Sequence, residues 1–246
     1  TTTITSTISV TPTANSCVGT PSTYTITVNP TPTVAVPANI TVCNNASVPA
    51  TGFVSTPTGG SFSWTNSNTA IGLASSGTGD IASFTATNTG TTTITSTISV
   101  TPTANSCVGT PSTYTITVNP TPTVAVPANI TVCNNASVPA TGFVSTPTGG
   151  SFSWTNSNTA IGLASSGTGD IASFTATNTG TTTITSTISV TPTANSCVGT
   201  PSTYTITVNP TPTVAVPANI TVCNNASVPA TGFVSTPTGG SFSWTN

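Results

Sequence analysis

The sequence predicts an all-β fold, a tandem array of β-sandwich domains with a 90-residue period, elongated along the chain. Residues 1–90 return unchanged as 91–180, and 181–246 reproduce 1–66. A period of 90 residues is too long for a solenoid coil of 20–50 residues and approaches the roughly 100 residues of one sandwich domain. Helix is disfavoured because Thr, Ser, Val, Gly and Pro dominate, and few strong helix formers remain.

The domain boundaries are predicted at prolines. Pro30 and Pro32 interrupt hydrogen-bond ladders and favour an extended linker. This phase gives a C-terminal hairpin of a preceding repeat (1–30), two complete repeats (31–120 and 121–210), and the N-terminal part of a following repeat (211–246). Because both ends fall inside a repeat, we expect the chain to be an interior fragment of a longer protein.

Strands are predicted wherever apolar side chains alternate with hydroxyl side chains. Ile4, Ile8 and Val10, for example, alternate with Thr and Ser. The glycines of IGLASSGTGD predict an irregular crossing before the later strands. In the first complete repeat the expected strands are 33–43 (interrupted at Pro37), 47–55, 60–65, 81–87, and a final hairpin of 92–102 with 110–119.

The core is expected on the inward faces of these strands. The predicted core residues are Trp64, Trp154, Trp244, Phe62, Phe84, Tyr114, Ile116 and Val118. Trp64 has a second interpretation, because an exposed indole stacks on a sugar ring. A core tryptophan on the third strand is the more usual role in a sandwich.

The composition excludes several functions. The chain has no Lys, Arg or His and only two acidic residues, Asp80 and Asp170, so the partners of acid–base and nucleophilic catalysis are missing. We therefore expect no enzyme activity and no cofactor. Nucleic-acid binding needs cations that are absent. No apolar run is long enough for a transmembrane helix, which predicts no membrane insertion in this segment. One Asp per repeat indicates a turn carboxylate instead of a metal site.

The order of several phrases in each repeat resembles a known family. TVC at Cys43, FSWTN at Trp64, IGLASSGTGDI with FTATN, and TPTANSCVGTPSTYTITVNPTPTV resemble the PKD-like, immunoglobulin-like repeats of very large cell-surface proteins of Bacteroidota. Those proteins include gliding-motility adhesins and are typically exported by the type IX system. The resemblance implies a secreted stalk or filament module at the cell surface. SWTN replaces the acidic WDFGDG-type turn of the better-known PKD pattern, which removes the carboxylates of a calcium site.

Six cysteines in a chain that resembles extracellular proteins predict disulfides. In the immunoglobulin topology that the resemblance implies, Cys43 and Cys107 lie at opposite ends of the sandwich, about 30 Å apart, whereas a disulfide needs Cα atoms within about 7 Å. We therefore favour Cys43 with Cys197, between repeats, with Cys17, Cys107, Cys133 and Cys223 pairing outside the fragment. A shifted first strand would instead give pairs within a repeat, Cys43–Cys107 and Cys133–Cys197.

Three functions stay open at this point. The first is a mechanical spacer in a surface adhesin or extracellular filament, stabilised by disulfides, whose partners are the neighbouring repeats. The second is a module that binds surface glycans through Trp64, Tyr24-type aromatics and loop asparagines. The third is a self-assembling fibre in which identical chains associate side by side.

Overall fold

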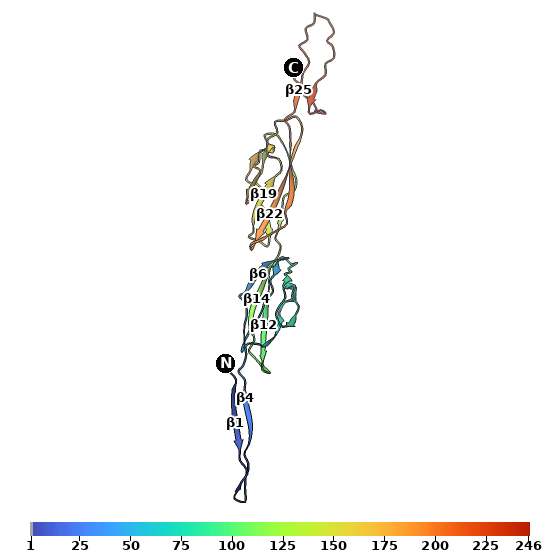
Figure 1. Ribbon diagram of the computed structural model, residues 1–246. Helices are drawn as coiled ribbons and strands as arrows, with labels where there is room; N and C mark the ends of the chain where they lie inside the picture. Colours follow the sequence, from blue (N-terminus) through green and yellow to red (C-terminus); the bar gives the residue numbers. More distant parts are fainter. Residues whose placement is uncertain (1) are drawn as a thin grey trace. The chain divides into compact units, whose positions relative to one another are not determined.

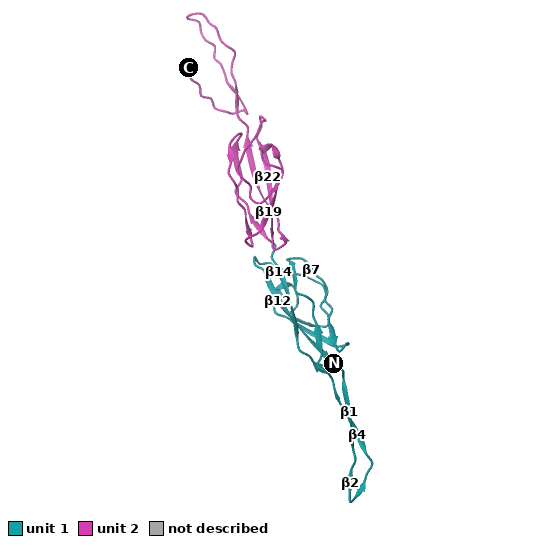
Figure 2. Cartoon of the chain, turned by 90° about the vertical axis from the view of Figure 1, so that its left-hand side faces the viewer, with its two compact units in different colours: residues 1–121 teal, residues 122–246 magenta. Residues whose placement is uncertain are grey.

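The structure is a computed structural model that describes residues 2–246. It confirms the all-β fold class, with two immunoglobulin-like sandwiches of about 90 residues in tandem. The chain divides into two compact units, residues 1–121 and 122–246 (Figures 1 and 2). Each unit contains one complete repeat and one partial repeat.

The main layer of the first unit is a six-stranded sheet. Its long central hairpin pairs β12 with β14 in antiparallel register, from Ile94↔Val118 to Val100↔Ser112. β9 pairs antiparallel with the other edge of β12, and β6 runs parallel to β14. The strands in spatial order are β10 (Ser76–Thr78), β9 (Ser61–Asn66), β12 (Ile94–Ala104), β14 (Ser112–Asn119) and β6 (Ile40–Cys43), with β13 (Cys107–Val108) beside the end of β12.

The opposite layer consists of two short strand pairs and one helical turn. β5 (Thr33–Ala35) pairs with β8 (Val54–Thr56), and β7 (Ser47–Val48) pairs with β11 (Phe84–Thr85). The 3-10 turn η1 (Thr69–Ile71) buries Ile71 between the layers. Asn68 caps this turn, because its side-chain oxygen accepts a hydrogen bond from the Ala70 N–H at 3.1 Å.

The predicted strand 33–43 is divided between the two layers. β5 pairs with β8 in one layer, and β6 joins β14 in the other. Pro37, which cannot donate to a ladder, lies in the crossing segment. Asn39 fixes the second half of the crossing, since its side-chain oxygen accepts from the Thr115 N–H at 2.9 Å.

The predicted strands 47–55 and 81–87 are also shorter than expected. The first divides into β7 and β8, and Pro49 follows β7 directly. The second retains only β11 as a strand. The Ala86 N–H still donates to Ala46, which continues the register of the β7–β11 pair, but the Thr87 N–H donates to Ile71 of η1.

The core lies between the two layers and contains most of the expected residues. Ile116 and Val118 are fully buried, Tyr114 and Trp64 nearly so, and Phe62 and Phe84 are half-buried against them. Residues of η1 and the crossing segment complete the core from the opposite side. The buried apolar set of this repeat is Val34, Val48, Phe53, Trp64, Ile71, Ile81, Ala86, Ile98, Val100, Tyr114, Ile116 and Val118.

The second unit contains the same sandwich from an identical sequence. Its sheet has the order β16–β24–β22–β19–β20, with β24 again parallel to β16. Trp154 is buried like Trp64. The elements are β15 (Thr123–Ala125), β16 (Ile130–Cys133), β17 (Ser137–Val138), β18 (Val144–Thr146), β19 (Ser151–Asn156), η2 (Thr159–Ile161), β20 (Ser166–Thr168), β21 (Phe174–Thr175), β22 (Ile184–Ala194), β23 (Cys197–Val198) and β24 (Ser202–Asn209).

The partial repeats form fewer elements. At the N-terminal side, β1 (Ile4–Val10) and β4 (Ser22–Val28) form a hairpin with β2 (Thr13–Ala14) and β3 (Cys17–Val18) near its turn. At the C-terminal side, only β25 (Thr213–Ala215) and β26 (Val234–Thr236) form. The prediction that Trp244 is a core residue is wrong, because its side chain is 75% exposed. Trp64 pairs with Val100 of β12 across the sheet, whereas residues 241–246 around Trp244 form no strand.

Candidate functional site

Each complete repeat presents a hairpin tip at one end of its sheet. In the first repeat, Asn105 and Ser106 have φ of 48° and 64°, values typical of a tight two-residue hairpin turn. The next residue is Cys107, which pairs with Ala104 across the turn. The short turn therefore fixes Cys107 at the extreme end of the hairpin. We call Ala104–Cys107 the hairpin tip.

Cys43 lies at the other end of the same sheet. The parallel register of β6 and β14 sets Cys43 opposite Asn119, the last residue of β14. Asn44, in the turn that follows, donates from Nδ2 to the hydroxyl of Thr121 at 3.0 Å and so holds the start of the linker. We call Cys43, Asn44 and Asn119 the socket. Socket and tip are separated by the length of β14.

The chain reaches each repeat beside the hairpin tip. A Cβ atom on Gly109 would overlap the backbone of Pro32, so only glycine lets the linker pass this close. The second repeat has the same contact between Gly199 and Pro122. The chain therefore enters a repeat at the tip end and leaves it at the socket end.

The first unit also contains one junction between repeats. Asn29, the counterpart of Asn119 in the preceding hairpin, donates from Nδ2 to the carbonyl oxygen of Asn105 at 3.2 Å. Thr3 donates to the side-chain oxygen of the same asparagine at 3.0 Å, as Thr93 does to Asn119 at 2.8 Å. The hairpin tip of one repeat thus contacts the strand end that forms part of the socket in a complete repeat.

The six cysteines, all within the described residues 2–246, differ in state. Cys17, Cys107, Cys133 and Cys223 are free thiols, whereas Cys43 and Cys197 are each disulfide-bonded. The identical copies differ in exposure as well. Cys197 is 1% exposed and Cys43 is half-buried, but their copies Cys107 and Cys133 are half-buried and exposed, respectively.

Trp64 is placed as a core residue and offers no surface for a sugar. Its indole packs over Gly77 of β10 so closely that a Cβ there would overlap the ring. The indole Nε1 is itself buried. The glycan hypothesis depended mainly on an exposed Trp64, so this position removes its strongest support.

The tyrosines of the complete repeats are equally inaccessible. Tyr114 and Tyr204 are 3% exposed, whereas Tyr24 of the N-terminal hairpin is 56% exposed. Burial raises the pKa of the Tyr114 phenol, and the side chain of Thr51 lowers it in part. The same two causes act on the pKa of Tyr204, where Thr141 replaces Thr51.

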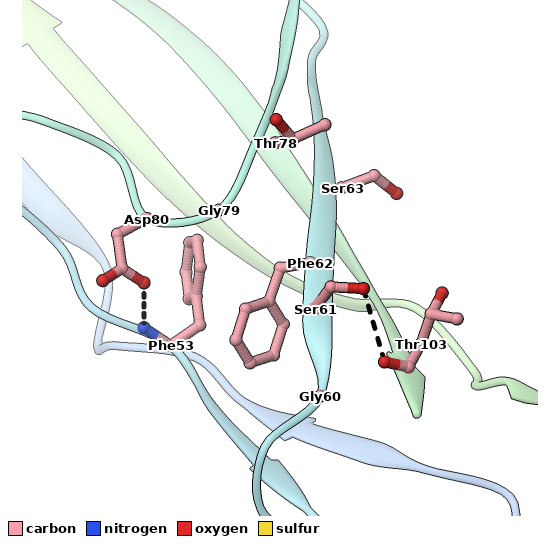
Figure 3. A pocket seen from close by; sticks show the side chains of 9 residues that line it. All are labelled: Phe53, Gly60, Ser61, Phe62, Ser63, Thr78, Gly79, Asp80 and Thr103. Carbon is pink, nitrogen blue, oxygen red and sulfur yellow. Dashed lines mark hydrogen bonds between the residues drawn. The ribbon is translucent and has the colours of Figure 1, made fainter. Parts of the chain in front are cut away.

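Asp80 lies at a shallow cleft of about 610 Å³ beside two phenylalanine rings (Figure 3). Its Oδ1 accepts a hydrogen bond from the Phe53 N–H at 2.9 Å, and the Phe53 and Phe62 rings meet at 5.6 Å between centroids. The carboxylate therefore joins two loops that are 27 residues apart, and the bond is not the local turn contact that the sequence predicted. Within residues 2–246, no three His, Cys, Asp or Glu side chains come together as metal ligands would.

Asparagine side chains hold the loops, a role that the sequence patterns did not predict. Asn88 is 3% exposed; its Nδ2 donates to Thr92 and Val118 at 2.9 and 2.8 Å, and its N–H donates to Asn44 Oδ1 at 2.8 Å. Asn66 donates to the carbonyls of Leu73 and Ala74 at 2.8 and 3.1 Å. The high frequency of asparagine in the predicted loops was the feature of the sequence that could have indicated this role.

The outward face of the main sheet carries mainly hydroxyl side chains. The strand registers align them in rows across the sheet, for example Thr41, Thr117 and Thr95. We call this set the hydroxyl face. Its members in the first repeat are Thr41, Ser61, Ser63, Thr65, Ser76, Thr78, Thr95, Thr97, Ser99, Thr101, Thr103, Thr113, Thr115 and Thr117.

Known proteins resemble the fold only distantly. Rst D1-D2 gives a TM-score of 0.40 at 12% identity over 74% of this chain and all of that one. Drosophila N-cadherin EC1-4 gives 0.38 at 13% identity, over 79% and 53% of the two chains. No curated protein matches the sequence. None of the helices in the described part of the chain is long and apolar enough to cross a bilayer.

A family match is far more specific than these structural similarities. The PKD-like domain profile matches residues 40–122 and again residues 130–212. Each matched range contains the six strands of one main sheet, from β6 to β14 and from β16 to β24. With both repeats matched over most of their length, the chain belongs to the PKD-like domain family.

Proposed function

We propose that the chain is a non-catalytic spacer segment of an extracellular surface protein, a stalk in which each repeat adds length. The observation that carries this proposal is the path of the chain through a repeat. The chain arrives beside the hairpin tip at Gly109 and departs at the socket beyond Asn119. A domain with entrance and exit at opposite ends lengthens the chain, while one with both at the same end folds it back.

The length of the central strands determines how much length each repeat adds to the stalk. β12 has 11 residues, so it spans about 36 Å at roughly 3.3 Å per residue. The proline-containing linker adds to this, and Asn44 fixes its first residues to the socket. Thus each repeat is expected to extend the stalk by about 30 Å or more.

The cellular setting is also part of the proposal. A disulfide is typical of secreted and surface proteins, since cytosolic thiols are kept reduced. An uncharged surface of hydroxyl groups, with only two carboxylates in 246 residues, suits a spacer that must not bind its surroundings. On the basis of the sequence resemblance, we further propose export by a type IX system in a Bacteroidota-like bacterium, in an adhesin of the gliding type.

Small-angle scattering tests the spacer role. The wild-type chain would be compared with a variant that carries one more copy of residues 121–210, inserted at the Pro210–Thr211 bond. We expect the maximum dimension to increase by about 30–40 Å, the length of one sheet. An unchanged maximum dimension with an increased radius of the cross-section would mean that the repeats fold back, and would overturn the proposal.

A second candidate function is lateral association of identical chains through the hydroxyl face. This face has no charge, and every hydroxyl group can both donate and accept, so two copies can match each other. No aromatic ring lies among its members, which makes the face a poor sugar platform. Because the face recurs in every repeat, weak contacts would add along the chain.

Sedimentation velocity over a range of concentrations tests this association. Thr97→Glu with Thr187→Glu introduces one charge on the face of each repeat and should abolish any association. Thr58→Glu with Thr148→Glu adds the same charge in exposed turns that are not part of the hydroxyl face and serves as the matched control. A wild-type chain that stays monomeric at all concentrations would exclude the fibre function.

A further inference from the structure

We propose that a disulfide joins each repeat to the next, between the socket cysteine of one and the tip cysteine of the other. In this chain the bond is Cys43 with Cys197, and Cys133 and Cys107 would follow the same rule with neighbouring repeats. This inference goes beyond the spacer role, because it concerns the covalent chemistry of the junction and holds whatever the length of the stalk.

The two cysteines within one repeat lie too far apart to form a disulfide. Cys43 lies opposite Asn119, and Cys107 lies at the turn before β14 begins. The eight residues of β14, together with the residues that join it to the tip, keep the two cysteines more than about 25 Å apart. A disulfide requires Cα atoms within about 7 Å, so the pair Cys43–Cys107 does not fit the register.

The first unit contains a junction that shows how a hairpin tip meets the preceding repeat. There the hairpin tip at Asn105 accepts a hydrogen bond from Asn29 at the end of the preceding hairpin. Since the sequence repeats without a change, the tip at Asn195 has the same chemistry to offer to Asn119. The repeat therefore favours the same contact at every junction.

The socket and tip cysteines lie close to these asparagines. Cys43 is the direct neighbour of Asn119 across the sheet, and Cys197 follows Asn195 by two residues. In the junction within the first unit, Asn29 donates a hydrogen bond to Asn105. An equivalent hydrogen bond from Asn119 to Asn195 would bring the sulfur atoms of Cys43 and Cys197 close to each other.

The states of the six cysteines agree with this rule. Cys43 and Cys197 belong to the junction whose socket and tip both lie in complete repeats, and these two are the cysteines that are disulfide-bonded. For the four free thiols, the partner demanded by the rule lies in a repeat outside residues 1–246. Cys197 is also less exposed than its copy Cys107.

The bond forms by thiol–disulfide exchange with a small disulfide such as oxidised glutathione. The thiolate of one cysteine attacks a glutathione sulfur and releases one reduced glutathione. The thiolate of the other cysteine then attacks the mixed disulfide and releases the second. The two cysteines lose two protons and two electrons in total, and glutathione disulfide gains them.

The test is a count of free thiols with a chromogenic disulfide reagent, after the folded, oxidised full-length chain has been denatured. The rule predicts four reactive thiols in the wild type, the four that are free in the structure. Bonds within repeats would leave only Cys17 and Cys223 reactive. Sedimentation under non-reducing conditions excludes bonds between chains.

Serine variants of the full-length chain make the test independent of the absolute count. Under the rule, Cys107→Ser and Cys133→Ser each lower the count by one, because each removes a free thiol. If bonds form within repeats, the same variants raise the count by one, because each releases a partner. Cys43→Ser and Cys197→Ser should each raise the count by one, and the double variant should restore the wild-type number.

A count that rises in Cys107→Ser would overturn the inference. The scattering experiment on repeat length gives its result in reduced protein as well, so a failure of the disulfide rule and a failure of the spacer role are separate outcomes.

Discussion

The hairpin of residues 1–30 and the final hairpin of the first complete repeat have the same sequence and the same pairing, but not the same environment. Ile4 pairs with Val28 as Ile94 pairs with Val118. Tyr24 is 56% exposed and Ile26 47%, whereas Tyr114 and Ile116 are 3% and 1% exposed. The hairpin register is thus encoded locally, and burial comes entirely from the rest of the repeat.

The C-terminal partial repeat also retains its local strand pairing and lacks the strands that depend on distant partners. β25 and β26 pair as β5 and β8 do, so this contact is also local. Residues 220–223 and 241–246, the copies of β6 and β9, form no strand. These two strands pair with the final hairpin in a complete repeat, which explains why they depend on it.

The largest expected effect contrasts two copies of one isoleucine. Ile116→Ala leaves a cavity in the core and should reduce the free energy of unfolding of its repeat by about 2–5 kcal/mol. Ile26→Ala removes the same methyl groups from an exposed position and should cost less than about 0.5 kcal/mol. Urea denaturation followed by circular dichroism measures both.

The second repeat is an internal reference in this experiment. In Ile116→Ala, about half of the unfolding signal should move to lower urea and the other half should stay in place. Equal shifts for Ile116→Ala and Ile26→Ala would show that the N-terminal hairpin is buried as well, and would contradict the comparison.

A glycine pair sharpens the comparison further. Gly77→Ala forces a Cβ into the Trp64 indole and should cost about 1–3 kcal/mol through overpacking. Gly232, in the C-terminal partial repeat, has nothing within 4 Å of an added Cβ, so Gly232→Ala should be nearly neutral. The same urea titration compares them, and a neutral Gly77→Ala would mean that β10 can move away from the tryptophan.

Much of the fold could be predicted from the sequence, for the same reason that the hairpin forms locally. Strict alternation in 92–102 and 110–119 predicted β12 and β14, and GSFSWT predicted β9. The parallel pairing of β6 with β14 could not be predicted, since parallel partners are distant in sequence and no turn links them. The division of 33–43 between two layers depends on that pairing.

The candidate site was predictable in part. The distance between Cys43 and Cys107 follows from counting residues along extended strands. The role of asparagine was not predictable, because Asn88 and Asn44 act through hydrogen bonds to residues that only the folded chain brings near. Trp244 was assigned to the core by analogy with Trp64, and that analogy requires partner strands that its surroundings do not contain.

A smaller difference between the complete repeats and the C-terminal partial repeat is expected in tryptophan fluorescence. Trp64 and Trp154 are 8% exposed, and Trp244 is 75% exposed. Trp244→Phe should remove most of the acrylamide-quenchable emission and shift the remaining spectrum to the blue. Trp64→Phe is the matched control and should leave the quenchable part unchanged; a strong loss of quenching in this control would place Trp64 at the surface.

The smallest expected effect is the response of stability to alkaline pH. Burial raises the pKa of Tyr114 and Tyr204 above the ordinary value of 10.0, because the core disfavours the charged phenolate. Below pH 10 both states keep the proton, and the stabilising contribution is complete. Above it the unfolded chain releases the proton first, so the free energy of unfolding falls as the pH rises through the folded-state pKa. Urea midpoints at pH 9 and pH 11 should therefore differ in the wild type and differ less in the Tyr114→Phe, Tyr204→Phe double variant. An equal loss in both would assign the alkaline sensitivity to groups outside the two cores.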